Sequence, residues 1–382
     1  MNKKEKLSSF DTHAPILSRL RDFHWYWNST TSNSSSSHLE EETWRKYTDV
    51  ENEIIEDAFI SKKTHVEIDD NIIINLKDQC QYKKENDYRR FSIKRFIETN
   101  DNRQNIHSRK ERFTFPITLA SPSQTPSRKI FKNDALFWLR TGHFSRAYFQ
   151  LELEEENKTM VDIVEEAAQG IIKEGIALEK QHTAEWLAKQ LLDMKSKIRN
   201  EKIEITTKIP LEIGETCVNL YTRDSFWFKL INHILRQPAT ITLQQVKTLG
   251  SFCYLLHNYL HENYGSDIVT LYRGLTITDD ERQEFMKDSI RFTSFTSTSQ
   301  NKNVAEMFGG NTLLILDLNG DYEDGVKAHC GAGISHLSQF PDEEEFLIWP
   351  MTDFDFIKYE YDNEKNKHLI FLKSSGSNFT TV

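Results

Sequence analysis

At 382 residues the chain is longer than one ordinary domain, so we expect two or three separate cores. The 24 Phe, 13 Tyr and 7 Trp supply apolar material for those cores, and 38% hydrophobic against 28% charged residues excludes a wholly disordered chain. No apolar run approaches the roughly 20 residues that cross a membrane, and none follows the N-terminus as in a signal peptide, which predicts a soluble protein of the cytoplasm, the nucleus or both.

Charge and cysteine usage narrow the class of ligand. The four cysteines include no C-x-x-C pair, so we expect reduced thiols and no metal site. The net charge is -10, yet basic residues gather between Lys83 and Arg112. This local excess favours a phosphate-bearing partner over bulk nucleic acid, and a solvated basic surface is the alternative.

The first hundred residues contain two runs that alternate aromatic and polar side chains. These runs, at residues 23–27 and 42–47, are typical of strands, and the Ser-rich stretch 30–38 between them predicts a hairpin loop. Residues 54–59 have helical spacing. Further strands are expected at residues 66–68, 72–76 and 91–95. Together these elements predict a small half-barrel with one helix.

Trp25, Trp44 and Glu56 stand in the order that names the WWE domain, and this stretch resembles that module. The resemblance implies a WWE-like domain over residues 15–98. Some WWE domains bind the iso-ADP-ribose unit of poly(ADP-ribose), so one expected role is recognition of ADP-ribose or its polymer. A WWE fold used for protein contacts is the alternative.

The resemblance also implies candidate ligand residues in this domain. Tyr47 and Gln81 stand where adenine-stacking and hydrogen-bonding residues occur in WWE domains, and Arg90 is a candidate partner for phosphate. Two positions depart from the pattern of the polymer binders: Ile72 replaces a second tyrosine, and Phe91 replaces an arginine that contacts phosphate. We therefore expect weak binding of the polymer or none.

Residues 99–133 lose periodicity and gather proline and serine, which predicts a linker with a short strand at residues 113–115. The second domain is expected over residues 134–382, with its core motifs within 205–375.

Helices are expected first in this second domain. Apolar residues recur at helical spacing over residues 160–172 and 186–194, with a break near Gly175. Asp224 and Thr242 are expected to cap two later helices.

Beyond residue 264 the hydrophobic period changes from that of helices to that of strands. Glycines at residues 331–333 indicate a turn or hinge. Short strands are expected at residues 269–271, 292–295, 313–316, 346–348, 354–359 and 369–372. Helices followed by a mainly antiparallel sheet predict an α+β unit.

Three short motifs lie among these strands. They read Leu-Tyr-Arg-Gly at residues 271–274, Phe-Thr-Ser-Thr-Ser at 295–299, and Phe-Pro-Asp-Glu-Glu-Glu-Phe-Leu-Ile at 340–348. Singly, each is common on protein surfaces. In this order they resemble the Arg…Ser-Thr-Ser…Glu-x-Glu signature of the arginine-specific mono-ADP-ribosyltransferases. The resemblance implies a two-sheet sandwich with a central cleft that binds NAD.

Cleavage of NAD needs a cation for the pyrophosphate and a carboxylate beside the oxocarbenium-like ribose. Arg273 can hold a phosphate bidentately, a geometry that lysine cannot reproduce. By the resemblance, the backbone of Gly274 contacts the nicotinamide amide and Phe308 packs against its ring. The same resemblance assigns Ser297 to orient the catalytic glutamate, Glu345, which binds the ribose 2'-hydroxyl.

The acidic triplet at residues 343–345 separates two roles. Strand alternation predicts that Glu343 and Glu345 point into the cleft and that Glu344 points away. By the resemblance, Glu343 marks the enzymes that modify arginine. A guanidinium has a pKa above about 12, so its attack requires a carboxylate that positions it and accepts a proton.

The sequence therefore predicts an NAD-dependent protein-arginine ADP-ribosyltransferase that releases nicotinamide, with NAD and protein arginines as substrates. No membrane and no nucleic acid are expected as partners. An NAD glycohydrolase would use the same residues, with water as acceptor. A catalytically inactive adaptor that reads ADP-ribose through its WWE domain is a third possibility, against which the intact Arg, Ser and Glu-x-Glu residues argue.

Overall fold

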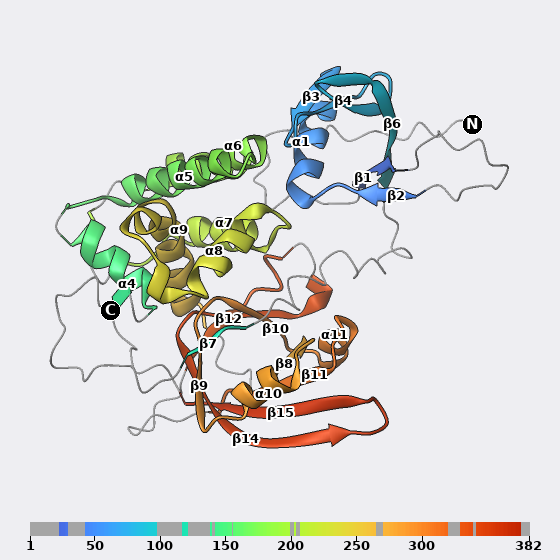
Figure 1. Cartoon of the computed structure of the whole chain (residues 1–382). Coiled ribbons are helices and arrows are strands. Elements are labelled where there is room, and N and C mark those ends of the chain that lie inside the picture. The colour runs from blue at the N-terminus through green and yellow to red at the C-terminus, as the bar shows by residue number, and fades with distance from the viewer. Residues whose placement is uncertain are drawn as a thin grey trace, which may run out of the picture.

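The computed structural model describes residues 23–29, 43–97, 117–120, 138–139, 142–154, 156–198, 202–203, 207–264, 270–319, 329–338 and 341–375. Within these ranges the chain forms a small N-terminal sheet unit, a layer of helices and a larger sheet that carries the C-terminal strands (Figure 1). No helix of the described ranges is both long enough and apolar enough to cross a bilayer.

The N-terminal unit is an antiparallel six-stranded sheet with one helix, as the sequence predicts. The strands lie in the order β2-β1-β6-β5-β4-β3. Helix α1 (Asp49–Ile60) starts with a capping box, in which Thr48 and Glu51 accept each other's backbone N–H groups. The strands are β1 (Phe23–Asn28), β2 (Trp44–Lys46), β3 (His65–Ile68), β4 (Ile72–Asn75), β5 (Cys80–Lys83) and β6 (Asn86–Ile97).

A buried carboxylate ties this unit together. Glu56 of α1 accepts a hydrogen bond from Trp25 Nε1 at 2.8 Å, and Arg95 of β6 donates to its two oxygens at 3.0 and 2.8 Å. Because a buried charge is costly without such partners, these three residues specify how β1, α1 and β6 meet.

The middle of the chain forms the helical layer. Its core joins large side chains such as Trp227 and Phe252, whose rings meet edge to face at 5.3 Å. The elements are α4 (Phe144–Tyr148), the π-helical turn η5 (Phe149–Leu153), α5 (Met160–Ala177), α6 (Gln181–Leu192), η6 (Lys195–Lys197), α7 (Leu211–Thr222), α8 (Phe226–Leu235), η7 (Pro238–Thr240) and α9 (Leu243–Glu262).

Two expectations about these helices were wrong and one is confirmed. Helix α5 runs unbroken through Gly175. The glycine is needed for the close approach of α6, because a Cβ there would lie 2.2 Å from Ala184 Cβ. Ser225 caps α8 with its side chain, whereas Asp224 lies one residue too early. Thr242 caps α9 with a capping box, as predicted.

The C-terminal strands form one hydrogen-bonded sheet of nine strands, in the order β12-β13-β10-β8-β11-β15-β14-β9-β7. Only the β11–β15 pair among these is parallel, which confirms the mainly antiparallel α+β class. The two sheets expected in a sandwich are joined here by hydrogen bonds into one sheet of nine strands. The strands are β7 (Leu119–Ala120), β8 (Thr270–Leu275), β9 (Ser289–Phe292), β10 (Thr296–Ser299), β11 (Thr312–Asp317), β12 (Gly331–Gly333), β13 (Glu345–Ile348), β14 (Thr352–Asp362) and β15 (Lys367–Ser374), with α10 (Asp279–Phe285), α11 (Lys302–Met307) and the 3₁₀ turn η8 (Pro341–Glu343) between them.

Two parts of this sheet differ from expectation. The glycines expected as a turn form strand β12, in which a Cβ on Gly331 would lie 2.2 Å from the carbonyl oxygen of Leu347, so glycine permits the close pairing with β13. The stretch expected as a linker supplies β7, which pairs with β9. The strand expected at residues 113–115 lies outside the described residues.

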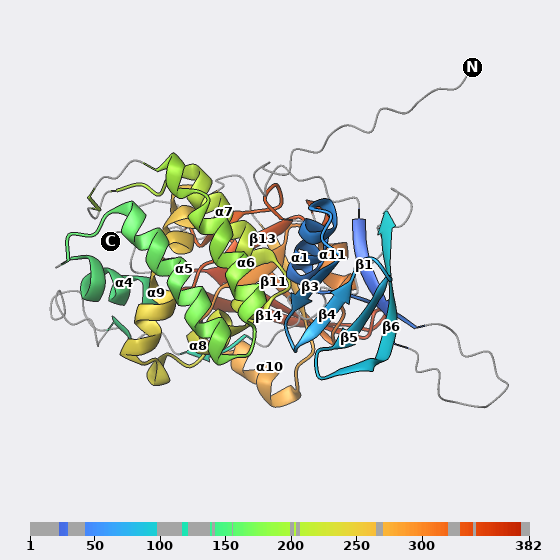
Figure 2. The same ribbon diagram turned by 90° about the horizontal axis from the view of Figure 1, so that it is seen from above.

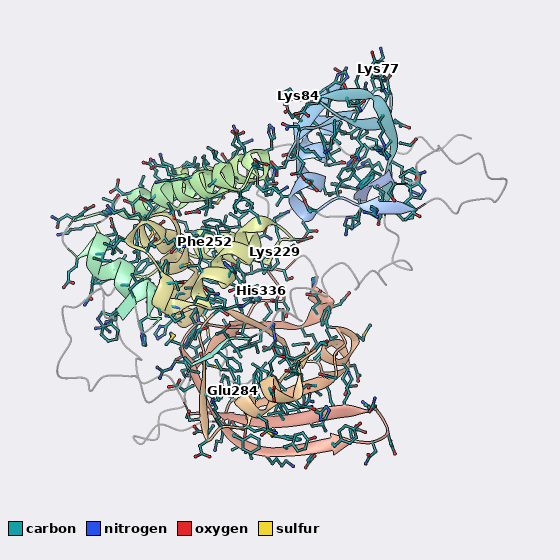
Figure 3. All side chains as sticks on the ribbon, in the orientation of Figure 1. Lys77, Lys84, Lys229, Phe252, Glu284 and His336 are labelled. Atoms are coloured by element: carbon teal, nitrogen blue, oxygen red, sulfur yellow. The ribbon has the colours of Figure 1, made fainter. Side chains whose placement is uncertain are left out.

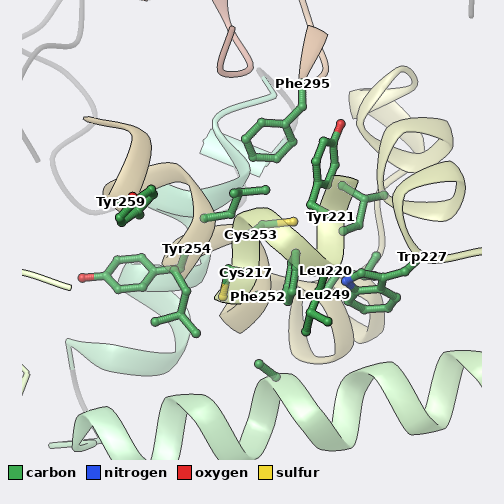
Figure 4. Packing of buried hydrophobic residues seen from close by; sticks show 14 of the residues in the cluster. Cys217, Leu220, Tyr221, Trp227, Leu249, Phe252, Cys253, Tyr254, Tyr259 and Phe295 are labelled. Carbon is green, nitrogen blue, oxygen red and sulfur yellow. The ribbon is translucent and has the colours of Figure 1, made fainter. Parts of the chain in front are cut away.

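The large sheet meets a different core on each face. Leu347 belongs to the core shared with the helices, and its neighbours Phe346 and Ile348 belong to a second core. Phe295, immediately before β10, carries the helical core onto the sheet, and its ring lies 5.4 Å from that of Tyr221 (Figure 4). One face of β10 and β13 is thus fixed against the helices.

The N-terminal unit packs directly against the helical layer, where α1 lies beside α6 (Figure 2). Asp69 Oδ1 accepts from the backbone N–H groups of His182 and Thr183 at 2.9 and 3.4 Å, at the start of α6. Lys180, the N-cap residue of α6, gives no side-chain cap, so a carboxylate from the other unit caps this helix.

Helix α1 adds to this interface an acidic stripe at residues 49, 53 and 57. Asp49 Oδ2 accepts from the backbone N–H of Asp224 at 2.9 Å, and Asp57 Oδ2 accepts from Trp186 Nε1 at 3.2 Å. Between them Glu53 lies 3.5 Å from Arg223, and both side chains are at most 2% exposed. The two units therefore share a buried, charged contact.

Candidate active site

The three motifs lie on neighbouring strands, with β10 between β13 and β8. In this register Ser299 pairs with Glu345 on one side and with Tyr272 on the other. Side chains alternate along β13, so Glu345 points to the same face as Leu347, the face that packs against the helices. The register thereby brings residues that are up to 72 positions apart in the sequence onto three consecutive strands of the sheet.

Arg273 reaches from β8 toward β10. Its Nη1 donates to the backbone oxygen of Ser297 at 2.5 Å, and the side chain is 3% exposed. Ser297 and Glu345 are equally withdrawn, at 4% and 0% exposed. Burial removes these polar groups from water, which strengthens every electrostatic interaction that they make.

Gly274 and Phe308 are also brought to this place, by the packing of α11 on β8. A Cβ on Gly274 would lie 2.5 Å from the carbonyl oxygen of Gly309 and 2.6 Å from that of Ala305. Phe308 ends α11 and is 1% exposed. The close approach that requires glycine is therefore made by the end of α11, a reason that the sequence did not reveal.

The acidic triplet buries its outer two residues, but its geometry differs from the predicted strand. Glu343 and Glu345 are 5% and 0% exposed, and Glu344 is exposed. Only Glu345 lies in a strand: Glu343 ends the turn η8, and Glu344 adopts a left-handed conformation with φ of 45°. The turn η8 thus buries the side chain of Glu343, whereas Glu345 follows the alternation of β13.

The remaining hydroxyls of the Ser-Thr-Ser motif fasten β10 to the acidic triplet. Thr298 Oγ1 donates to the backbone oxygen of Phe346 at 2.8 Å, and Ser299 Oγ donates to that of Glu343 at 2.7 Å. Asn301, which the sequence analysis did not single out, donates from Nδ2 to Glu344 Oε1 at 2.9 Å. Asparagine is a favoured N-cap residue, so its place two positions after the motif could have indicated the start of a helix there.

A cavity lies at the far end of β10 and β13, between α4, α9 and the residues that follow β13. His257 and Trp349 line it, with ring centroids 5.9 Å apart. Burial, followed by the nearby His261, lowers the pKa of His257 to about 4. None of the predicted catalytic residues lines this cavity.

The candidate ligand residues of the N-terminal unit are only partly together. Tyr47 and Gln81 are each 5% exposed and share a hydrogen bond of 2.5 Å from the hydroxyl to Oε1. Burial raises the pKa of the Tyr47 hydroxyl. Arg90 lies over the ring of Tyr82, which alternation places on the face opposite Gln81.

Arg89, unlike Arg90, lies beside a residue that pairs with Gln81. Its guanidinium lies 5.3 Å from the ring of Phe91, and Phe91 is the residue that pairs with Gln81 across β5 and β6. Lys84, in the same basic stretch, lies on the side of the unit that faces away from the large sheet (Figure 3).

Comparison with known families gives two matches. A model described as NAD:arginine ADP-ribosyltransferase matches residues 149–380, and a model described as WWE domain matches residues 23–95.

Curated relatives carry names of the same kind. The erythroblast NAD(P)(+)–arginine ADP-ribosyltransferase of Gallus gallus is 32% identical over 156 residues, which are 41% of this chain and 41% of the relative. NAD(P)(+)–arginine ADP-ribosyltransferase 1 of Gallus gallus is 36% identical over 88 residues, 23% of this chain and 24% of the relative. The chain thus spans less than half the length of each of these relatives.

Solved structures with some likeness include the eucaryotic mono-ADP-ribosyltransferase ART2.2, at 22% identity and a TM-score of 0.36 over 57% of this chain and 89% of that one. The type III effector XopAI from Xanthomonas axonopodis pv. citri has 15% identity and a TM-score of 0.41, over 63% and 92% of the two chains. Because the first family model spans more than half of the chain, the protein belongs to the NAD:arginine ADP-ribosyltransferase family and carries a WWE domain before the matched region.

Proposed function

We propose that the protein transfers ADP-ribose from NAD to arginine side chains of other proteins and releases nicotinamide. The observation that carries this proposal is the placement of Arg273, Ser297 and Glu345 on three neighbouring strands in a chain of this family. Glu343, buried at the end of the adjoining turn, supplies the second carboxylate that an arginine acceptor requires.

Each residue has one task in this reaction. Arg273 binds the pyrophosphate of NAD, for which a planar guanidinium has the matching donors. Glu345 holds the ribose and stabilises positive charge as the bond from C1' to nicotinamide breaks, and Ser297 orients that glutamate. A guanidinium nitrogen of the acceptor then bonds to C1', and Glu343 takes the proton that this nitrogen loses.

Access to these residues requires movement. Arg273, Ser297 and Glu345 are at most 4% exposed, so NAD reaches them only if covering parts of the protein shift. If the covering parts close again over bound NAD, they exclude water from the reacting atoms, which favours transfer to an acceptor over hydrolysis.

The deciding experiment incubates the purified chain with NAD labelled in its adenine and with agmatine as a simple guanidino acceptor. Labelled agmatine supports the proposal. Free ADP-ribose without labelled agmatine would identify an NAD glycohydrolase instead. Binding of ADP-ribose with no turnover would identify an adaptor.

The WWE domain is proposed to recognise ADP-ribose or a protein partner. The ring of Tyr47 is 5% exposed, so it must be uncovered before adenine can stack on it. For Gln81 Oε1 to accept from a ligand, it must leave the Tyr47 hydroxyl, which costs the hydrogen bond between them. Calorimetry of the full chain with iso-ADP-ribose should therefore give weak binding or none. A dissociation constant below about 1 μM, or roughly -8 kcal/mol, would show that the pair opens easily.

A further inference from the structure

The turn that carries Glu343 has a backbone that glutamate does not favour. Residues Pro341–Glu343 form the 3₁₀ turn η8, and the backbone N–H of Glu344 closes it onto the oxygen of Pro341 at 3.0 Å. Glu344 then takes a φ of 45°, in the left-handed region that favours glycine or asparagine. Such a conformation persists only where surrounding contacts hold it.

Those contacts come from the last residue of β10 and the two residues that follow it. Ser299 Oγ donates to the backbone oxygen of Glu343 at 2.7 Å, and the backbone N–H of Gln300 donates to the oxygen of Glu344 at 3.0 Å. Asn301 Nδ2 donates to the carboxylate of Glu344 at 2.9 Å. The turn is thus held at three points.

Asn301 links this turn to the NAD side of the site. Its Oδ1 accepts from the backbone N–H of Asn303 at 3.0 Å and starts α11, and the far end of α11 packs on Gly274. Asn301 N also donates to Ser299 Oγ at 3.0 Å, which fixes the hydroxyl that holds Glu343. One side chain therefore belongs both to the turn and to the helix that supports β8.

We infer that Ser299, Asn301 and Glu344 are positioning residues that hold Glu343 where an incoming guanidinium meets it, and so set how well arginine competes with water. This inference rests on the proposed function and deepens it, since none of the three residues is required for bond cleavage in NAD. A loosened turn would displace Glu343 and leave Glu345, anchored in β13, in place.

The hydrogen bond between residues 301 and 344 can be reversed to test this. Asn301→Asp keeps an acceptor for the N-cap of α11 but has no donor, and it sets two carboxylates against each other. Glu344→Gln keeps the acceptor oxygen and serves as the matched control. In the double variant the amide of residue 344 donates to the carboxylate of residue 301, so the same hydrogen bond forms in the opposite direction.

Transfer to agmatine and release of free ADP-ribose are measured in one reaction of the full chain. Asn301→Asp should lower the ratio of transfer to hydrolysis by about five- to tenfold, the scale of one hydrogen bond, and raise the KM for agmatine. Glu344→Gln should stay within about twofold of the wild type, and the double variant should recover the ratio. An unchanged ratio in Asn301→Asp, or no recovery in the double variant, overturns the inference.

Hydrogen exchange separates this inference from the proposed function. Amides 343–345 should exchange faster in Asn301→Asp and regain protection in the double variant, whatever the reaction. If wild-type protein labels no agmatine but the exchange pattern holds, the proposed function fails and the holding of the turn stands. If exchange is the same in all variants, the three residues do not hold the turn.

Discussion

Removing the carboxylate of Asp69 should lower the stability of the whole chain, because this residue of the WWE domain caps a helix of the region that matches the ADP-ribosyltransferase family. Asp69 is 3% exposed and accepts from two backbone N–H groups at the start of α6. An N-cap side chain is worth about 0.5 to 2 kcal/mol, and a negative charge at a helix N-terminus adds about 0.3 to 1 kcal/mol. We expect Asp69→Ala to lower the free energy of unfolding by about 2 kcal/mol.

The neighbouring aspartate provides a matched control. Asp70 pairs with Lys180 at 2.7 Å, with the two side chains 56% and 33% exposed, so this pair is worth less than about 1 kcal/mol. Asp70 has a φ of 62°, which asparagine also tolerates, so Asp70→Asn removes the charge without straining the backbone. Both variants would be unfolded in urea and compared with the wild type by tryptophan fluorescence and circular dichroism.

The two probes also test whether the units unfold together. Trp25 lies in the WWE core and Trp227 in the helical core, so fluorescence reports on both units, whereas circular dichroism is dominated by the helical layer. A shared buried interface predicts coincident transitions by the two probes in the wild type. Equal losses of stability in Asp69→Ala and Asp70→Asn would refute the capping argument. Separate transitions in the wild type would refute the coupling of the two units.

Three further outcomes follow. Glu345→Gln should abolish both arginine transfer and NAD cleavage with an unchanged circular dichroism spectrum, because a key electrostatic group supplies about 3 kcal/mol or more to the transition state; wild-type turnover would remove Glu345 from the mechanism. Glu343→Gln should lose labelled agmatine and keep free ADP-ribose, since water needs no carboxylate partner, and equal loss of both products would assign Glu343 to the pocket as a whole. Burial lowers the pKa of His257 from 6.5 to about 4, so the unfolded chain binds the extra proton and stability falls as pH drops from about 6.5 toward 4, by at most about 3 kcal/mol. Urea titrations at pH 7, 5.5 and 4.5 should show that His257→Asn flattens this fall, and an unchanged slope would contradict it.

Local patterns predicted most of the elements. Thr242 begins α9 because its hydroxyl and Gln245 form a capping box, and the strands of the large sheet follow the apolar runs. The three motifs also predicted that Arg273, Ser297 and Glu345 lie on or beside strands. Which residues of these strands lie opposite one another depends on pairing across the sheet, which the sequence does not show.

What the sequence did not yield depends on contacts between distant segments. The sequence suggests that Gly175 breaks a helix, but this glycine allows the close approach of α6. The glycines of β12 likewise suggest a turn, but Gly331 allows the close pairing with β13. The geometry of Glu343 and Glu344 followed a turn that three residues of another segment hold.

One neglected signal was the acidic stripe of α1. Asp49, Glu53 and Asp57 recur every four residues, and like charges at this spacing destabilise a helix that stands alone. A helix with this repeated repulsion needs a partner of opposite charge or one that donates hydrogen bonds, and here the partners are Arg223, Trp186 and the backbone N–H of Asp224.

The contact of Glu53 with Arg223 restricts how this protein can change over generations. Loss of either partner leaves the other charge buried, at a cost of about 3 to 5 kcal/mol, whereas replacement of both by apolar groups can be neutral. Substitutions at these two positions should therefore be accepted in pairs, although 170 residues separate them. If the WWE domain were exchanged for one from another protein, a different residue at position 53 would leave the charge of Arg223 buried without its carboxylate.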